Sequence, residues 1–257
     1  MRKYLIAVSV AAVCLLPALA AGTAKHPEPV DFSFKGPFGT YDRNQLKRGY
    51  QVYKEACSAC HSLKLVAFRN LADPGGPEFT EAEAKALAAA VEVPTLDEYG
   101  DPATRTATLA DHFPMPFANE LAAKAANNGA VPPDLSLIAK GREGGADYVH
   151  ALIGLGYAAI PDEHTVVPDG TYYNPYMAGG IIAMPQPISD DQVDYVEEGI
   201  PQTVDQYGKD VAAFLMWAAE PKMEARKQLG MGVIIFLSFL SVLLYLSYRR
   251  VWRNVDH

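Results

Sequence analysis

Two cysteines and a histidine lie together in the segment Cys57-Ser58-Ala59-Cys60-His61, which has the pattern C-x-x-C-H. A c-type haem is attached to a polypeptide at this pattern. The two thiols can form thioethers with the haem vinyl groups, and a ring nitrogen of the adjacent His61 can bind the iron. The motif therefore indicates one covalently held haem c, with His61 as proximal ligand, and electron transfer as the broad task.

Two other uses of paired cysteines fit the sequence less well. A thioredoxin-like C-x-x-C opens a helix in a βαβ unit, whereas a predicted helix ends at Cys57. A four-ligand zinc site needs a further Cys or His pair at ligand spacing. His112, His150 and His164 are scattered, and the third cysteine, Cys14, lies in the N-terminal segment.

The second axial ligand determines whether small molecules can reach the iron. A His-only haem keeps an open site, whereas His plus Met closes it and suits an electron carrier. Met115 and Met184 each precede a proline, which restricts the local chain and leaves a loop methionine able to point inward. Spacing alone favours Met184, with Met115, the nearby Met177 and a second histidine as alternatives.

The attachment motif needs a rigid support, and the preceding residues are predicted to form a helix. This helix begins after Asp42, a good N-cap residue, and runs to about Cys57. Leu46, Tyr50 and Tyr53 recur at helical spacing and predict one buried face.

Further helices alternate with loops rich in Gly and Pro, and no strand pattern extends beyond short pieces. The predicted helices are Thr80–Val91, Asn119–Asn127, Ala146–Leu155 and Asp205–Ala219. The turn-rich segments are Asp73–Thr80, Pro94–Pro116 and Gly156–Pro187. The last of these has few periodic apolar residues, so we expect it to pack around the large apolar haem.

The two ends of the chain carry membrane signals. Residues 1–20 have a basic start, an apolar stretch and a small-x-small ending at Ala20, typical of a secretory signal peptide. Residues 229–248 contain no charge and, at 1.5 Å per residue, span about 30 Å, the thickness of a bilayer core. The alternatives are a retained N-terminal anchor and a buried core helix.

These signals predict a single-pass protein of the bacterial inner membrane. Residues 21–222 form the periplasmic haem domain, residues 229–248 cross the membrane, and residues 249–257 form a cytoplasmic tail rich in Arg. Residues 21–220 carry 14 Lys and Arg against 28 Asp and Glu, a formal charge of −14. An acidic domain argues against nucleic-acid binding and favours a basic soluble partner.

Several separated stretches resemble the cytochrome c1 family, the haem subunit of the cytochrome bc1 complex, over nearly the whole mature chain. The matching stretches are Arg48–Tyr53, Cys57–Leu63, Ala126–Ala130, Pro132–Ser136, Arg142, Gly144–Gly145, Asp147–Val149, Tyr173–Tyr176, Met184–Pro185 and Trp217–Pro221. Their order and spacing are far more specific than C-x-x-C-H alone. The resemblance implies a mainly α, cytochrome c-like haem domain enlarged by long loops, with one C-terminal transmembrane helix.

The resemblance also implies roles for single residues. In that family, the methionine eight residues after Asn-Pro-Tyr is the axial ligand, which corresponds to Met184. The family generally lacks a methionine at the position of Met115. Arg142 is expected near a haem propionate, with a surface charge as the alternative, and the carbonyl of Pro132 or Pro133 is expected to hold His61 Nδ1.

Some expectations from the resemblance concern packing around the haem. Asn127, Tyr148 and Tyr176 are expected beside the haem, with plain packing as the alternative. Gly49 and Tyr53 match positions where a glycine and an aromatic residue let the first helix of a cytochrome c fold cross the last one closely.

The implied function is electron transfer from a Rieske iron–sulfur protein to a soluble or membrane-anchored c-type cytochrome. The resemblance implies a complex with cytochrome b, expected to be dimeric, in which this subunit makes or breaks no substrate bond. Other possibilities are a membrane-tethered c-type carrier, an oxidase haem subunit and a haem gas sensor with an open sixth site.

Overall fold

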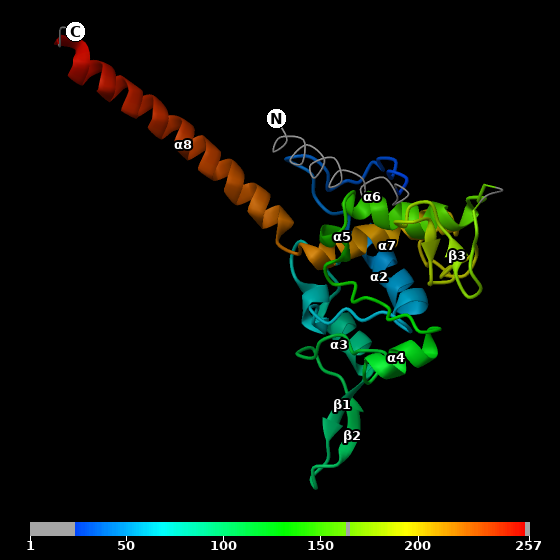
Figure 1. Cartoon of the computed structure of the whole chain (residues 1–257). Helices are drawn as coiled ribbons and strands as arrows, with labels where there is room; N and C mark the ends of the chain where they lie inside the picture. The colour runs from blue at the N-terminus through cyan, green and yellow to red at the C-terminus, as the bar shows by residue number, and fades with distance from the viewer. Residues whose placement is uncertain (1–23, 163–164, 255–257) are drawn as a thin grey trace, which may run out of the picture.

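The computed structural model describes residues 24–162 and 165–254. The predicted signal peptide, residues 1–20, lies outside the described residues, as do residues 255–257 of the tail. The mainly helical architecture and the single long apolar C-terminal helix are confirmed. Figure 1 shows a loop-rich body from which that helix and a strand pair project in different directions.

The helices and strands in chain order agree with most of the predicted elements. The α-helices are α2 (Arg43–Val52), α3 (Glu81–Ala89), α4 (Glu120–Ala126), α5 (Ile138–Gly141), α6 (Gly145–His150), α7 (Val204–Ala219) and α8 (Met223–Val251). The π-helices are η2 (Tyr53–Cys57) and η4 (Ala151–Leu155), and the 3₁₀ helices are η3 (Phe68–Ala72), η5 (Gly156–Ala158) and η6 (Trp252–Asn254). The strands are β1 (Glu92–Leu96), β2 (Pro102–Thr106), β3 (Tyr172–Tyr173) and β4 (Ile181–Ile182).

The helix starts follow local chemistry that the sequence displays. The Asp42 carboxylate accepts hydrogen bonds from two backbone N–H groups of α2, and the side-chain amide oxygen of Asn119 accepts one from Ala122 N of α4. Thr80 and Glu83 form a reciprocal capping box at the start of α3. These caps satisfy N–H groups that would otherwise lack partners in the first turn.

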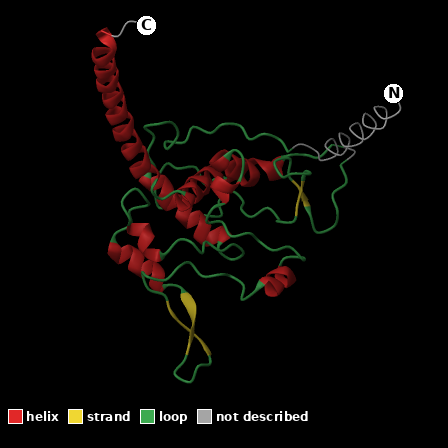
Figure 2. Ribbon diagram, turned by 60° about the vertical axis from the view of Figure 1, so that its left-hand side comes forward, coloured by secondary structure: helices red, strands yellow, loops and turns green. Residues whose placement is uncertain are grey.

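The β1–β2 hairpin is an element that the sequence pattern does not predict. Its antiparallel register runs from Glu92 opposite Thr106 to Leu96 opposite Pro102. Prolines usually argue against a strand, but in a two-stranded ribbon every strand has a free edge that tolerates them. Figure 2 shows this hairpin standing away from the helices.

The core forms where α2 crosses α7. A Cβ added to Gly49 would lie 2.1 Å from the carbonyl oxygen of Asp210, so the two backbones approach closely. Tyr53 is 2% exposed and lies against the rings of Phe113 and Phe214. The close helix crossing expected at Gly49 and Tyr53 is therefore present.

A buried ion pair also joins α2 to α7. Asp210 is fully buried and accepts a hydrogen bond from Arg48 Nε at 2.9 Å. Gln45, Gln206 and the Tyr195 hydroxyl also donate to its carboxylate. These donors offset the large cost of removing a carboxylate from water, so the crossing is specified by charge as well as by packing.

Candidate haem-binding site

The attachment motif begins inside a π-helical turn. At the end of η2 the N–H of Ser58 donates to the carbonyl of Tyr53 at 2.8 Å, five residues earlier, and in the next turn the N–H of His61 donates to the carbonyl of Cys57 at 2.9 Å. Such wide turns are frequent at functional sites. Cys57 and Cys60 are free thiols, and burial, followed by the nearby Cys60, raises the pKa of Cys57 to about 12. The two thiols thus lie one tight turn apart, and the N–H of Cys60 donates to the carbonyl of Cys57 at 3.1 Å.

A backbone carbonyl orients the imidazole of His61. Nδ1 of His61 lies 2.8 Å from the carbonyl oxygen of Pro133, one of the two carbonyls, Pro132 or Pro133, that the family resemblance led us to expect there. A carbonyl only accepts hydrogen bonds, so Nδ1 carries the proton and Nε2 keeps its lone pair. Burial lowers the pKa of His61, which also favours the neutral ring. This is the tautomer that binds a metal ion through Nε2.

The loop that supplies this carbonyl is fastened to the residues after the motif. Leu135 N donates to the carbonyl of Ser62 at 2.9 Å, and the Asp134 carboxylate accepts from the Ser62 hydroxyl and from Lys64 N. Burial opposes ionisation of Asp134, but these hydrogen bonds outweigh it and hold its pKa below the usual range. A charged Asp134 therefore keeps the Pro133 carbonyl in register with His61.

Met184 lies just after β4 and is held through its backbone. The Tyr157 hydroxyl, in η5, donates to the carbonyl of Met184 at 2.9 Å. Burial raises the pKa of Tyr157 well above its ordinary value, so the hydroxyl remains a donor. Sequence reasoning missed Tyr157, because no local pattern connects it with a residue so far along the chain.

Asn174 ties the segment that leads to Met184 to the π-helix η4. It is fully buried, and its Nδ2 donates to the carbonyl of Leu152 at 2.8 Å while its N–H donates to the carbonyl of Gly180 at 2.8 Å. A Cβ at Gly156 would lie 2.3 Å from the Asn174 side chain, so glycine leaves the room that this amide needs. The family resemblance included the Asn-Pro-Tyr stretch that contains Asn174 but implied no role for this residue.

The remaining predicted residues have the following surroundings. Asn127 caps the end of α4 and donates from Nδ2 to the carbonyl of Ala123. The Tyr148 hydroxyl lies 3.9 Å from Met177 Sδ. Arg142 is exposed, and its side chain makes no hydrogen bond or ion pair within the described residues. The haem roles assigned to these residues remain predictions.

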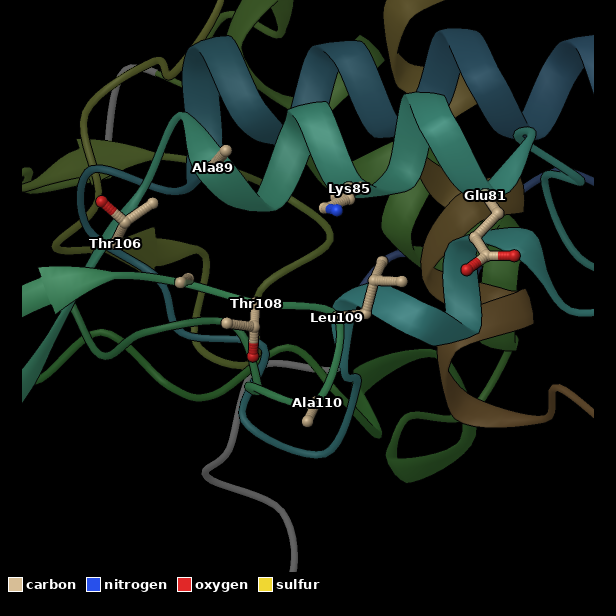
Figure 3. A pocket seen from close by; sticks show the side chains of 8 residues that line it. Glu81, Lys85, Ala89, Thr106, Thr108, Leu109 and Ala110 are labelled. Carbon is tan, nitrogen blue, oxygen red and sulfur yellow. The ribbon is translucent and has the colours of Figure 1, made fainter.

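The donor set fits a c-type haem. It provides two free thiols one turn apart, an imidazole with Nε2 available and a thioether sulfur on a separately anchored loop, which match the groups that hold haem in His/Met cytochromes. Met115, the alternative to Met184, is 62% exposed. A cleft of about 520 Å³ between α3 and the 106–110 loop has no Cys, His or Met in its lining (Figure 3).

Comparisons with known proteins place these features in a family. The model of the cytochrome C1 family matches residues 32–255. The chain is 45% identical to cytochrome c1 of Rhodospirillum rubrum over 92% of this chain and 90% of that protein. It is 45% identical to the cytochrome b-c1 complex catalytic subunit of Candida albicans, over 93% of this chain and 81% of that protein.

Another relative is a longer protein. The chain is 46% identical to the protein named cytochrome b/c1 of Bradyrhizobium diazoefficiens over 87% of this chain. The match spans only 35% of that longer protein.

Proposed function

The chain belongs to the cytochrome c1 family, and we propose that it accepts electrons from a Rieske iron–sulfur protein and donates them to a c-type cytochrome. Cys57 and Cys60 would hold one haem c through thioethers, and His61 and Met184 would be the ligands of its iron. The observation that carries this proposal is the His61–Pro133 contact beside two free thiols, because it presents an iron ligand at an attachment motif. The bound haem supplies a one-electron ferric–ferrous couple.

Backbone and side-chain contacts of the protein would keep His61 and Met184 in place in both oxidation states of the iron. The Pro133 carbonyl fixes the ring of His61, and the charged Asp134 holds that carbonyl in place. Tyr157 fixes the backbone of Met184. A fixed ligand pair keeps small molecules from the iron and lowers the structural change that accompanies each electron.

Arg142, Asn127 and Tyr148 complete the proposed haem surroundings. The exposed guanidinium of Arg142 lacks a partner within the described residues, so it can pair with a propionate. Tyr148 and Asn127 line the same proposed pocket. These roles rest on the family resemblance and on the free donors of Arg142.

The partners and the location follow from the relatives and from charge. One relative is named cytochrome b/c1, which supports cytochrome b as a neighbour of this chain in a bc1 complex that we expect to be dimeric. Helix α8 is long and apolar enough to cross a membrane, and we place the haem domain, residues 21–222, on the periplasmic side of the bacterial inner membrane. The charge of −14 on residues 21–220 favours a basic electron acceptor.

Axial ligation is tested by replacing the proposed ligand. In the purified full-length haem protein, Met184→Leu should abolish the Met–iron charge-transfer band and allow the reduced protein to bind CO rapidly. Met115→Leu is the matched control and should leave both properties unchanged, since Met115 is exposed. Rapid CO binding by the unchanged protein would contradict His/Met ligation and favour a gas sensor.

The place in the complex is tested by gentle detergent purification of the tagged chain from its native membrane. Co-purification of a b-type cytochrome and a Rieske protein, with haem reduction by added quinol that depends on both, is the expected result. Isolation of the tagged chain alone would favour a free membrane-tethered carrier instead.

A further inference from the structure

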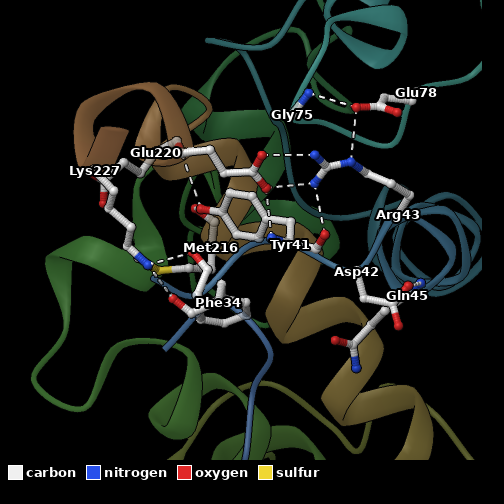
Figure 4. Close-up of polar contacts among 12 residues, drawn as sticks. Phe34, Tyr41, Asp42, Arg43, Gln45, Gly75, Glu78, Met216, Glu220 and Lys227 are labelled. Carbon is white, nitrogen blue, oxygen red and sulfur yellow. Dashed lines mark hydrogen bonds and ion pairs between the residues drawn. The ribbon is translucent and has the colours of Figure 1, made fainter. Parts of the chain in front are cut away.

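The junction between the haem domain and α8 is held by polar contacts that span distant parts of the chain (Figure 4). Arg43 binds Glu224 through two hydrogen bonds of 2.7 and 2.8 Å. Lys227 Nζ donates to the carbonyl oxygens of Phe34 and Gly39. The first two turns of α8 are therefore fixed to the body of the protein.

A cleft of about 460 Å³ opens beside this junction, which is a size typical of small-molecule sites. We call its four basic residues the junction cluster: Lys35, Lys140, Arg226 and Lys227. The acidic residues in the lining are Asp147 and Glu220, so the cleft has a formal charge of +2. This is a local exception in a domain that is strongly acidic overall.

The junction cluster has donors that the protein does not use. Arg226 donates through Nε to Glu220 at 2.5 Å, and its terminal NH groups make no hydrogen bond within the described part of the chain. Lys140 makes one hydrogen bond, to Glu220, although an ammonium carries three donors. A planar guanidinium beside an ammonium matches the oxygen atoms of a phosphate group.

The position of the cleft relative to the membrane points to a membrane ligand. Arg226 and Lys227 precede Leu229, where the uncharged run of α8 begins, by three and two residues. At 1.5 Å per residue they lie roughly 3–5 Å from the hydrocarbon core, which is the headgroup layer of a bilayer. The Met216 and Met223 side chains add apolar lining at the same place.

We propose that this cleft binds the phosphate headgroup of an anionic phospholipid, whose acyl chains lie along α8. Arg226 and Lys140 contact the phosphate, while Lys227 supplies longer-range attraction. The charge of Lys35 is paired with Asp147 at 2.7 Å. The site differs from the haem site, because its lining contains neither Cys nor His. Its ligand lies at the membrane surface and not in the electron path.

Lipid binding is measured by native mass spectrometry of the full-length haem protein in detergent, titrated with phosphatidylglycerol, phosphatidylcholine or inorganic phosphate. Each lost charge should weaken phosphatidylglycerol binding about fivefold, so Arg226→Gln with Lys140→Gln should weaken it by roughly 25-fold. Lys222→Gln is the matched control and should change the affinity less than twofold, because Lys222 is exposed and does not line the cleft.

Each further result of this experiment has a defined meaning. Binding of phosphatidylglycerol above phosphatidylcholine, lost in the double variant with unchanged circular dichroism, supports the site. Equal affinity in the double variant and the parent would overturn it, as would displacement of the lipid by inorganic phosphate at an equal concentration. If the double variant does not fold, the single variants must each show the fivefold loss, and unchanged binding in both would refute the proposal.

Discussion

Replacing Gly49 by alanine should destabilise the protein, although alanine is the better helix former. A Cβ at this position would lie 2.1 Å from the carbonyl oxygen of Asp210 and 2.7 Å from the Cβ of Phe214. Ordinary contact starts at 3.4 Å, so α2 and α7 would have to separate by roughly 1.3 Å. Because backbone atoms cannot rotate aside as a side-chain tip can, the strain affects the whole crossing.

The sign of the effect depends on which of two energies is larger. Replacing Gly by Ala inside a helix raises the free energy of unfolding by about 1 kcal/mol through helix propensity. Overpacking lowers it by about 1–3 kcal/mol, and by more when backbone must move. Because backbone must move at Gly49, we expect an overpacking cost at the upper end of this range, which leaves a net loss of about 2 kcal/mol in the free energy of unfolding. For a domain of this size, that loss lowers Tm by about 4–8 °C.

The measurement is thermal unfolding of the full-length haem protein in detergent, followed by circular dichroism. Gly141→Ala at the end of α5 is the matched control, since a Cβ there meets nothing within 4 Å and the backbone has an ordinary φ. It should be neutral or slightly stabilising. If Gly49→Ala is as stable as Gly141→Ala, the close-crossing argument is wrong.

Three other changes test the site and its support. Tyr157→Phe removes a hydrogen bond worth about 1 kcal/mol to the Met184 carbonyl, so a redox titration should show a lower potential and CO binding should become detectable. Asp210→Ala leaves the Arg48 guanidinium with only the half-exposed Glu197 as partner and should cost about 3 kcal/mol in urea unfolding, the lower end of the range for breaking a buried ion pair. The depressed pKa of Asp134 contributes stability that is complete above its ordinary pKa of about 4 and is lost as the pH falls. Asp134→Asn should therefore make the free energy of unfolding less dependent on pH in the acid range. The same pH dependence in the variant and the parent below a pH of about 4 would contradict this role.

Local features could be predicted because their physical cause lies within a few residues. The C-x-x-C-H motif places both thiols and the imidazole within five positions, so the type of cofactor can be predicted without tertiary information. Asp42, Thr80 and Asn119 satisfy N–H groups in the next helical turn, which is why the helix starts agree with the structure. The uncharged run at 229–248 is long enough by itself to predict a membrane helix, and α8 extends beyond it at both ends.

Other features depend on residues that meet only after folding. The close approach at Gly49 needs the backbone of Asp210, and the position of Met184 needs the hydroxyl of Tyr157. The sequence by itself predicted the haem cofactor, the helix starts and the membrane helix, since these follow from neighbouring residues and composition. The tertiary structure alone decided how the ligand loops are anchored and where the basic cleft lies, because hydrogen bonds and charge pairs between distant segments have no sequence period.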